Sequence, residues 1–140
     1  MSTKTPTTPA DHRTTVLRGT AEVLLGTVVA AVLTAMLLKA LVDASNDFLP
    51  LQPGPVAFAT AFGVLVGLGL LLVLRRFGRR RLFAPLVVVG TLLSLGGPIS
   101  LLSATQAEQP GVTDEAALAL IPLHLLVGAA VAFVLPRRVG

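Results

Sequence analysis

The chain has no cysteine, tryptophan or tyrosine among its 140 residues, and it carries little charge. Without cysteine it can form no disulfide, no thiolate nucleophile and no cysteine-ligated zinc or iron–sulfur site. Charged residues make up 13% of the chain, against about 25% in a typical soluble domain. Hydrophobic residues make up 54%, and the mean hydropathy is +0.84. These values exclude an ordinary soluble globule and also a disordered chain, which requires low hydrophobicity. The expected solvent is a lipid bilayer.

Histidine and basic residues give no sign of a metal or nucleic-acid site. The two histidines, His12 and His124, are far apart in the chain, and the first lies in a polar segment, so a two-histidine metal site on one helix is excluded. The net charge is +4, but the basic residues stand beside apolar runs and lack an aromatic stacking platform. We therefore expect no metal, no cofactor and no nucleic-acid partner, and we interpret the basic residues as signals of membrane topology.

Four apolar runs predict an all-α fold, a four-helix transmembrane bundle. The spans are expected at about 18–42, 55–74, 82–104 and 116–135. As a helix, the first would extend about 31 Å between its flanking basic residues, which matches the hydrocarbon core of about 30 Å. The sequence Thr113-Asp114-Glu115 is typical of a helix start. We expect a disordered tail at 1–15, one membrane domain at 16–136 and a short tail at 137–140.

Oppositely charged residues stand four apart at both ends of the first span. Arg18 precedes Glu22, and Lys39 precedes Asp43, so each pair can meet on one helix face. We expect an ion pair at each membrane surface. In the second span, Gly63 and Gly67 form a GxxxG pattern that permits close helix approach, either to a second copy or to another membrane protein. The ordinary glycine content of a membrane helix explains the pattern equally well.

The third span contains the segment SLGGPIS at 94–100. Pro98 has no N–H to bond the carbonyl of Ser94, so a kink is expected at Ser94–Pro98. Ser94 would lie about 18 Å above one membrane surface, and His124, entering from the other side, would lie at a similar depth. The two spans are joined by a short loop, and consecutive helices are usually neighbours.

The third and fourth spans therefore hold the candidate polar pocket. Its candidate residues are His124, Ser94, Ser100, Gly97 and Pro98. One interpretation is structural: a neutral His124 forms a hydrogen bond to a serine hydroxyl or to the carbonyl that Pro98 leaves without a donor. The other is a ligand site or proton-handling site, because an ionisable residue inside a membrane is a functional candidate. No second titratable group lies at that depth, which weighs against catalysis.

The distribution of charge predicts the orientation. The two termini and the 75–81 loop, RRFGRRR, hold ten of the eleven lysines and arginines, whereas five of the seven acids lie in the other two loops. The positive-inside rule then places both termini in the cytoplasm of a plasma-membrane protein with an even number of spans.

Two resemblances bear on function. SLGGPIS and the later segment IPLHLLVGAAVAFVLP resemble an uncharacterised actinobacterial family of small four-span membrane proteins, a domain of unknown function, over roughly residues 15–136. Locally, Ala21-Glu22-Val23 with Gly26-Thr27 resembles the first span of the small multidrug-resistance exporters, although the spacing is shifted and the aromatic residues of such drug sites are missing.

The first resemblance implies an integral membrane protein and supplies no catalytic residues. We therefore expect a non-enzymatic binding or accessory subunit. The alternatives are a proton-coupled small-molecule transporter using Glu22 or His124, as the second resemblance implies for Glu22, and a small membrane-embedded enzyme acting on a lipophilic substrate.

Overall fold

A computed structural model describes residues 9–139. It contains four helices long and apolar enough to cross a membrane, Thr14–Leu41, Pro53–Arg76, Arg80–Leu101 and Asp114–Val139, and no strand within the described residues. This confirms the predicted all-α fold and a multi-pass membrane protein. The elements are α1 (Pro9–Leu41), η1 (Leu49–Leu51), α2 (Pro53–Arg76), η2 (Arg80–Leu82), α3 (Phe83–Ser94), α4 (Gly96–Leu101), α5 (Asp114–Leu118), α6 (Leu120–Ala129), η3 (Ala130–Val134) and α7 (Leu135–Val139).

The helices extend further toward the chain ends than expected. Helix α1 begins at Pro9, so residues 9–15 are helical rather than a disordered tail, and residues 1–8 lie outside the described part. Helix α7 continues to Val139, where only a short tail was expected, because Val139 is buried and its carbonyl accepts a hydrogen bond from Arg75. The start of the fourth helix matches the prediction: the Thr113 hydroxyl accepts a hydrogen bond from the N–H of Ala116 at 3.1 Å.

Prolines interrupt the third and fourth helices at equivalent places. Helix α3 ends at Ser94, four residues before Pro98, and α5 ends at Leu118, four residues before Pro122. A proline cannot donate to the carbonyl four residues back, so the hydrogen-bond ladder breaks there. The third helix is interrupted at Leu95, between α3 and α4, and the kink stays a prediction. The fourth contains a second irregularity, the π-helical segment η3.

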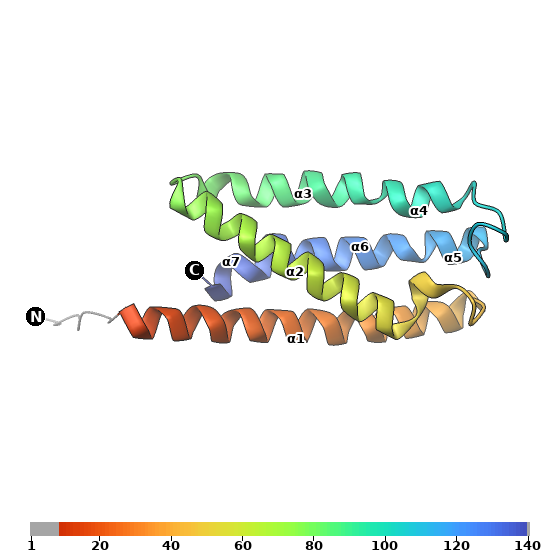
Figure 1. Ribbon diagram of the computed structural model, residues 1–140, viewed down its shortest axis with the longest axis horizontal. Coiled ribbons are helices and arrows are strands. Elements are labelled where there is room, and N and C mark those ends of the chain that lie inside the picture. The colour runs from red at the N-terminus through yellow and green to blue at the C-terminus, as the bar shows by residue number, and fades with distance from the viewer. Residues whose placement is uncertain (1–8, 140) are drawn as a thin grey trace, which may run out of the picture.

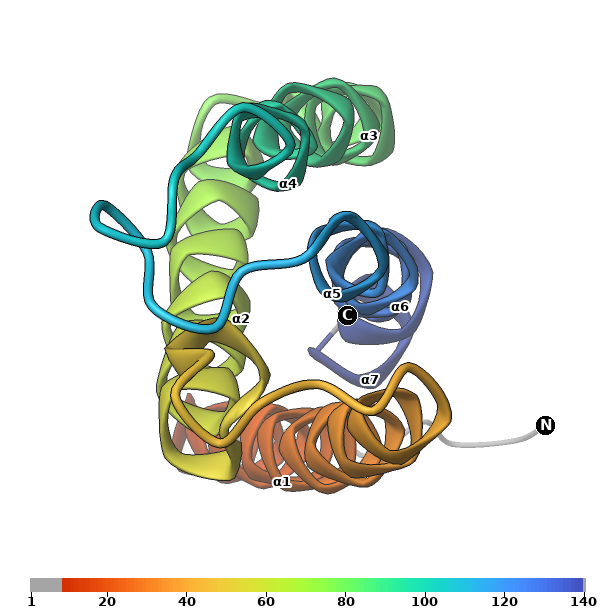
Figure 2. The ribbon, with the colours of Figure 1, turned by 90° about the vertical axis from the view of Figure 1, so that its right-hand side faces the viewer.

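The helices run side by side along one long axis (Figure 1). Both described chain ends and the 77–82 connection lie at one end, which we call the basic end, and the 42–52 and 102–113 connections lie at the other, the acidic end. Helix α2 crosses obliquely, from beside α1 at the acidic end to beside α3 at the basic end. Viewed along the axis, α1, α2 and α3 surround three sides of the fourth helix (Figure 2).

Two apolar cores hold this arrangement together. The core near the acidic end packs the loop residues Phe48 and Leu51 against α1, α5 and α6. The core near the basic end packs α1, α2, α3 and the end of the fourth helix together, with Phe83 and Leu135 nearly fully buried. Between the two cores, α2 and α3 separate.

Glycines allow the closest helix contacts within the chain. A Cβ at Gly67 would overlap the Val131 side chain, and one at Gly63 would touch Val127 at 3.6 Å. Both α2 glycines therefore face the fourth helix of the same chain, and an assembly through them stays an untested prediction. A Cβ at Gly128 would overlap the Thr91 side chain, so α3 and α6 approach closely there.

Candidate functional site: a groove between α2, α3 and α6

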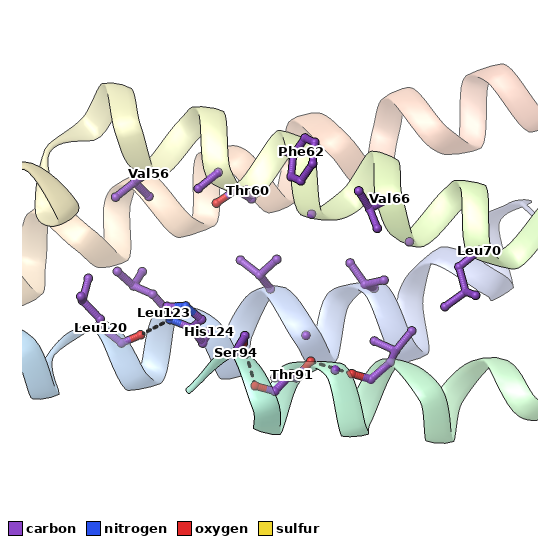
Figure 3. Close-up of a pocket in the computed structure, with 18 of the residues that line it drawn as sticks. Val56, Thr60, Phe62, Val66, Leu70, Thr91, Ser94, Leu120, Leu123 and His124 are labelled. Atoms are coloured by element: carbon purple, nitrogen blue, oxygen red, sulfur yellow. Dashed lines mark hydrogen bonds between the residues drawn. The ribbon is translucent and has the colours of Figure 1, made fainter. Parts of the chain in front are cut away.

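A groove of about 600 Å³ lies where α2 and α3 diverge. Helices α2 and α3 form its two walls, and α6 with the start of η3 forms its floor (Figure 3). Most of its lining is apolar, and none of its lining residues is acidic or basic apart from one histidine. The residues are Pro50, Pro55, Val56, Ala59, Thr60, Phe62, Gly63, Val66, Gly67, Leu70, Leu86, Val87, Gly90, Thr91, Ser94, Leu120, Leu123, His124, Val127, Gly128 and Val131.

The polar side chains of the groove gather in one layer. Thr60 lies seven residues into α2 and Ser94 seven residues before the end of α4, which places both about 10 Å from the acidic end. His124 lies ten residues after the start of α5, about 15 Å from the same end. Figure 3 shows these side chains, with Thr91, at similar positions along the length of the groove, Thr60 on one wall and Ser94 and Thr91 on the other. From this layer toward the basic end the lining is apolar.

The structure brings His124 and Ser94 into the same groove, as their depths predicted, but it does not join them by a hydrogen bond. The Ser94 hydroxyl donates to the carbonyl of Thr91 at 2.7 Å, and the Ser100 hydroxyl donates to the carbonyl of Gly97 at 2.7 Å. His124 Nδ1 contacts the carbonyl oxygen of Leu120, on its own helix, at 2.9 Å. Each of these side chains bonds a backbone carbonyl three or four residues earlier in the chain, because such a carbonyl is always within reach in a helix.

Three predicted residues fall outside the groove. Ser100, Gly97 and Pro98 do not line it. The backbones of the third and fourth helices do not approach closely at Gly97, since a Cβ there would meet nothing within 4 Å. A close approach is made six residues earlier, on α3, by Thr91 against Gly128.

The contact of His124 determines which of its nitrogens carries the proton. A carbonyl oxygen can only accept, so Nδ1 must be the donor to Leu120. In the neutral imidazole, Nε2 is then an acceptor. No hydrogen bond to Nε2 is made by any residue of the described part. His124 therefore presents one open acceptor in a half-buried position.

Thr60 is a groove residue that the sequence analysis missed. Only 4% of it is exposed, and its oxygen points into the space between α2 and α6 (Figure 3). The available signal was weak: a lone threonine in the first half of an otherwise apolar span, a residue that membrane helices tolerate easily.

Ionic contacts at the basic end join α1 to α7, and we call this set of contacts the clamp. Glu22 Oε1 pairs with Arg18 Nε at 3.0 Å, as predicted, and Glu22 Oε2 also contacts Arg138 at 3.4 Å. The second contact joins α1 to α7 where Gly19 lies against the carbonyl of Arg138. Glu22 is therefore outside the groove.

Basic side chains from the 75–81 region complete the clamp. Arg75 donates to the carbonyl of Val139 at 3.0 Å, and Arg80 donates to the carbonyl of Pro136 at 3.0 Å. Carbonyls at a helix C-terminus lack partners within the helix and carry partial negative charge, so these arginines stabilise the end of the fourth helix. The arginine-rich loop therefore has a packing role beside the topological role that its charge predicts.

The ion pair expected between Lys39 and Asp43 is wrong. Helix α1 ends at Leu41, and Asp43 adopts a left-handed backbone with φ of 48°, so it does not follow Lys39 on a helix face. Lys39 instead donates to the side-chain carbonyl of Asn46 at 2.7 Å.

Comparison with known proteins identifies the family. A profile of the family of unknown function DUF6069 matches residues 6–140, so the chain belongs to that family. No curated protein and no solved structure matches the chain. The predicted membership of an uncharacterised family is confirmed, and the actinobacterial origin stays a prediction.

Proposed function

We propose that this member of DUF6069 is a non-enzymatic binding or accessory protein of the plasma membrane that holds an apolar molecule in the groove between α2, α3 and α6. The observation that carries the proposal is the groove itself. Its volume of about 600 Å³ falls within the range of about 300–1,000 Å³ that is usual for ligand sites. Its mostly apolar lining with a few convergent polar groups has the composition of such a site.

The residues of the groove favour binding over catalysis and transport. An enzyme needs a second titratable group beside His124, and the groove lining supplies none. A proton-coupled exporter that uses Glu22 needs this carboxylate in its binding site, whereas Glu22 is held by two arginines at the basic end. No contact among the described residues specifically supports catalysis or transport.

Charge asymmetry supports the orientation that belongs to this proposal. The arginines of the 75–81 loop and of α7 gather at the basic end, and the acidic residues of the two longer connections gather at the other. Under the positive-inside rule the basic end faces the cytoplasm. The polar layer of the groove then lies in the outer half of the membrane.

Two glycine substitutions test occupancy of the groove. Gly90 lines the groove, and a Cβ there would meet nothing within 4 Å, so Gly90→Leu should fill the space without disturbing the fold. Gly69→Leu is the matched control, because Gly69 is equally open but does not line the groove.

The probe is dodecane, added to methyl-labelled protein in nanodiscs of deuterated phosphatidylcholine. The NMR methyl shifts of Val127, in the groove, should change saturably with dodecane, whereas those of Leu33, which is 61% exposed, should not saturate. Gly90→Leu should abolish the saturable change and Gly69→Leu should retain it. A wild-type response that does not saturate, or that survives Gly90→Leu, would refute the proposal.

A further inference from the structure

We infer that the groove selects molecules whose polar group is a hydroxyl, the class of long-chain alcohols, and that this hydroxyl is held between Thr60 and His124. The inference rests on the proposed function, since it names the ligand class of the same groove. It is carried by two hydrogen-bonding groups that the fold leaves open, one on the α2 wall and one on the α6 floor of the groove.

Thr60 provides the first open group. Its hydroxyl makes no hydrogen bond to another described residue, although the residue is only 4% exposed. Within the described part, no fully buried side-chain oxygen or nitrogen lacks a partner, so the Thr60 oxygen must remain reachable, and the groove is the space that it lines. In comparison, Thr20 on α1 and Thr91 on α3 donate to the carbonyls of Val16 and Val87. Thr60 is therefore a donor without an acceptor.

His124 provides the second open group. Its Nδ1 proton is engaged by Leu120, which leaves Nε2 as an acceptor without a donor. Thr60 lies on α2 and His124 on α6, and both face the same section of the groove (Figure 3). Water is scarce inside a membrane, so open polar groups there gain most from a ligand that satisfies them.

A hydroxyl is the simple group that satisfies both residues at once. It donates its proton to His124 Nε2 while its oxygen accepts from the Thr60 hydroxyl. An ether or ester oxygen accepts only, so it leaves Nε2 open. An ionised carboxylate likewise accepts only. An ammonium group donates only, so it can bond Nε2 but offers the Thr60 proton no acceptor. A hydrocarbon leaves both residues open.

The rest of the groove fits an alkyl chain. From Thr60 the α2 wall continues ten residues to Leu70, about 15 Å along the helix, through apolar residues such as Phe62 and Val66. On the opposite wall, Leu86 and Val87 lie at the far end of the groove from Ser94. The alcohol therefore lies with its hydroxyl in the polar layer and its chain toward the basic end.

The test compares three probes of nearly equal chain length with the full-length protein in phosphatidylcholine nanodiscs: 1-dodecanol, dodecyl methyl ether and dodecane. One net hydrogen bond corresponds to roughly 2- to 12-fold in affinity, so dodecanol should bind about 2- to 12-fold more tightly than the ether, which keeps only the bond from Thr60, and more tightly still than the alkane. Labelling histidine with ¹⁵N gives a second readout. Dodecanol should shift the Nε2 resonance of His124, and the resonances of His12, the other histidine of the sequence, serve as the internal reference.

Thr60→Val removes the hydroxyl while nearly conserving shape, and it should reduce dodecanol affinity by about 2- to 12-fold, the loss of one of its two hydrogen bonds. Thr27→Val is the control, because Thr27 is also buried, at 7% exposure, but lies outside the groove. It should preserve the preference for the alcohol.

Equal binding of all three probes to the wild-type protein would overturn the hydroxyl inference and leave the apolar groove intact. An alcohol preference that leaves His124 Nε2 unshifted would also overturn it. Saturable binding of none of the probes would refute the proposed function itself. Because the comparison of probes uses the unmodified chain, it holds even if Thr60→Val fails to fold.

Discussion

The contact of Gly67 with Val131 allows a quantitative test of how α2 packs on the fourth helix. A methyl group added at Gly67 would overlap the Cγ1 of Val131, whereas the remaining Val131 atoms lie at 3.6 Å, an ordinary contact. The overlap is therefore confined to one methyl group of a side chain that is 4% exposed. Gly69, on the same helix, meets nothing within 4 Å.

The two glycines should respond oppositely to alanine. Replacing a helical glycine by alanine is worth about 0.5–1 kcal/mol in backbone entropy, and Gly69→Ala should show this gain. Overpacking costs about 1–3 kcal/mol, so Gly67→Ala should lower the free energy of unfolding by about 1–2 kcal/mol net. In a Val131→Ala background the added methyl has room, and Gly67→Ala should then stabilise the protein as Gly69→Ala does.

The assay is reversible unfolding in mixed micelles at increasing sodium dodecyl sulfate, followed by helical circular dichroism. A double-mutant cycle over positions 67 and 131 isolates the pairwise contact, because the cost of Val131→Ala alone cancels. Equal effects of Gly67→Ala in both backgrounds would refute the tight contact. A change in oligomer mass without a change in stability would place Gly67 at an interface between chains instead.

Three further predictions concern the two ends of the bundle. Because the chain has no native cysteine, Ser45→Cys should react with an impermeant maleimide in intact cells and Arg79→Cys only after permeabilisation; the reverse pattern would invert the topology. Glu22→Gln should lower the free energy of unfolding by less than about 1 kcal/mol, since the side chain is 44% exposed, and the loss should shrink at high salt; a salt-independent loss of several kcal/mol would contradict an exposed clamp. The backbone N–H and hydroxyl of Thr105 hold the pKa of the Glu108 carboxyl below its usual value of 4.5, so this turn is stabilised above that pH and loses the contribution as pH falls through the lowered pKa. In an NMR titration, Thr105→Val should bring the Glu108 pKa part of the way back, and an unchanged pKa would disprove the role of the hydroxyl.

Hydropathy and charge alone determined the number and approximate bounds of the membrane helices. Each span is long enough to cross a bilayer, and this property depends only on a local count of apolar residues. Local contacts were also predictable: Arg18 meets Glu22 one turn away, and Thr113 caps the helix that follows it. The Lys39–Asp43 pair failed because the helix ended two residues earlier than its spacing required.

The existence and lining of the groove depend on the tertiary structure. Its walls exist because α2 crosses from α1 to α3, and that crossing depends on which small residues meet which side chains, as Gly67 meets Val131 and Gly128 meets Thr91. Depth along the helices predicted that His124 and Ser94 would share a level, but depth carries no information on helix rotation. In the structure, Ser94 and His124 each form a hydrogen bond within their own helix, and Thr60 on α2 lines the groove. The sequence could not predict this arrangement, because a uniformly apolar span does not indicate which of its faces is buried.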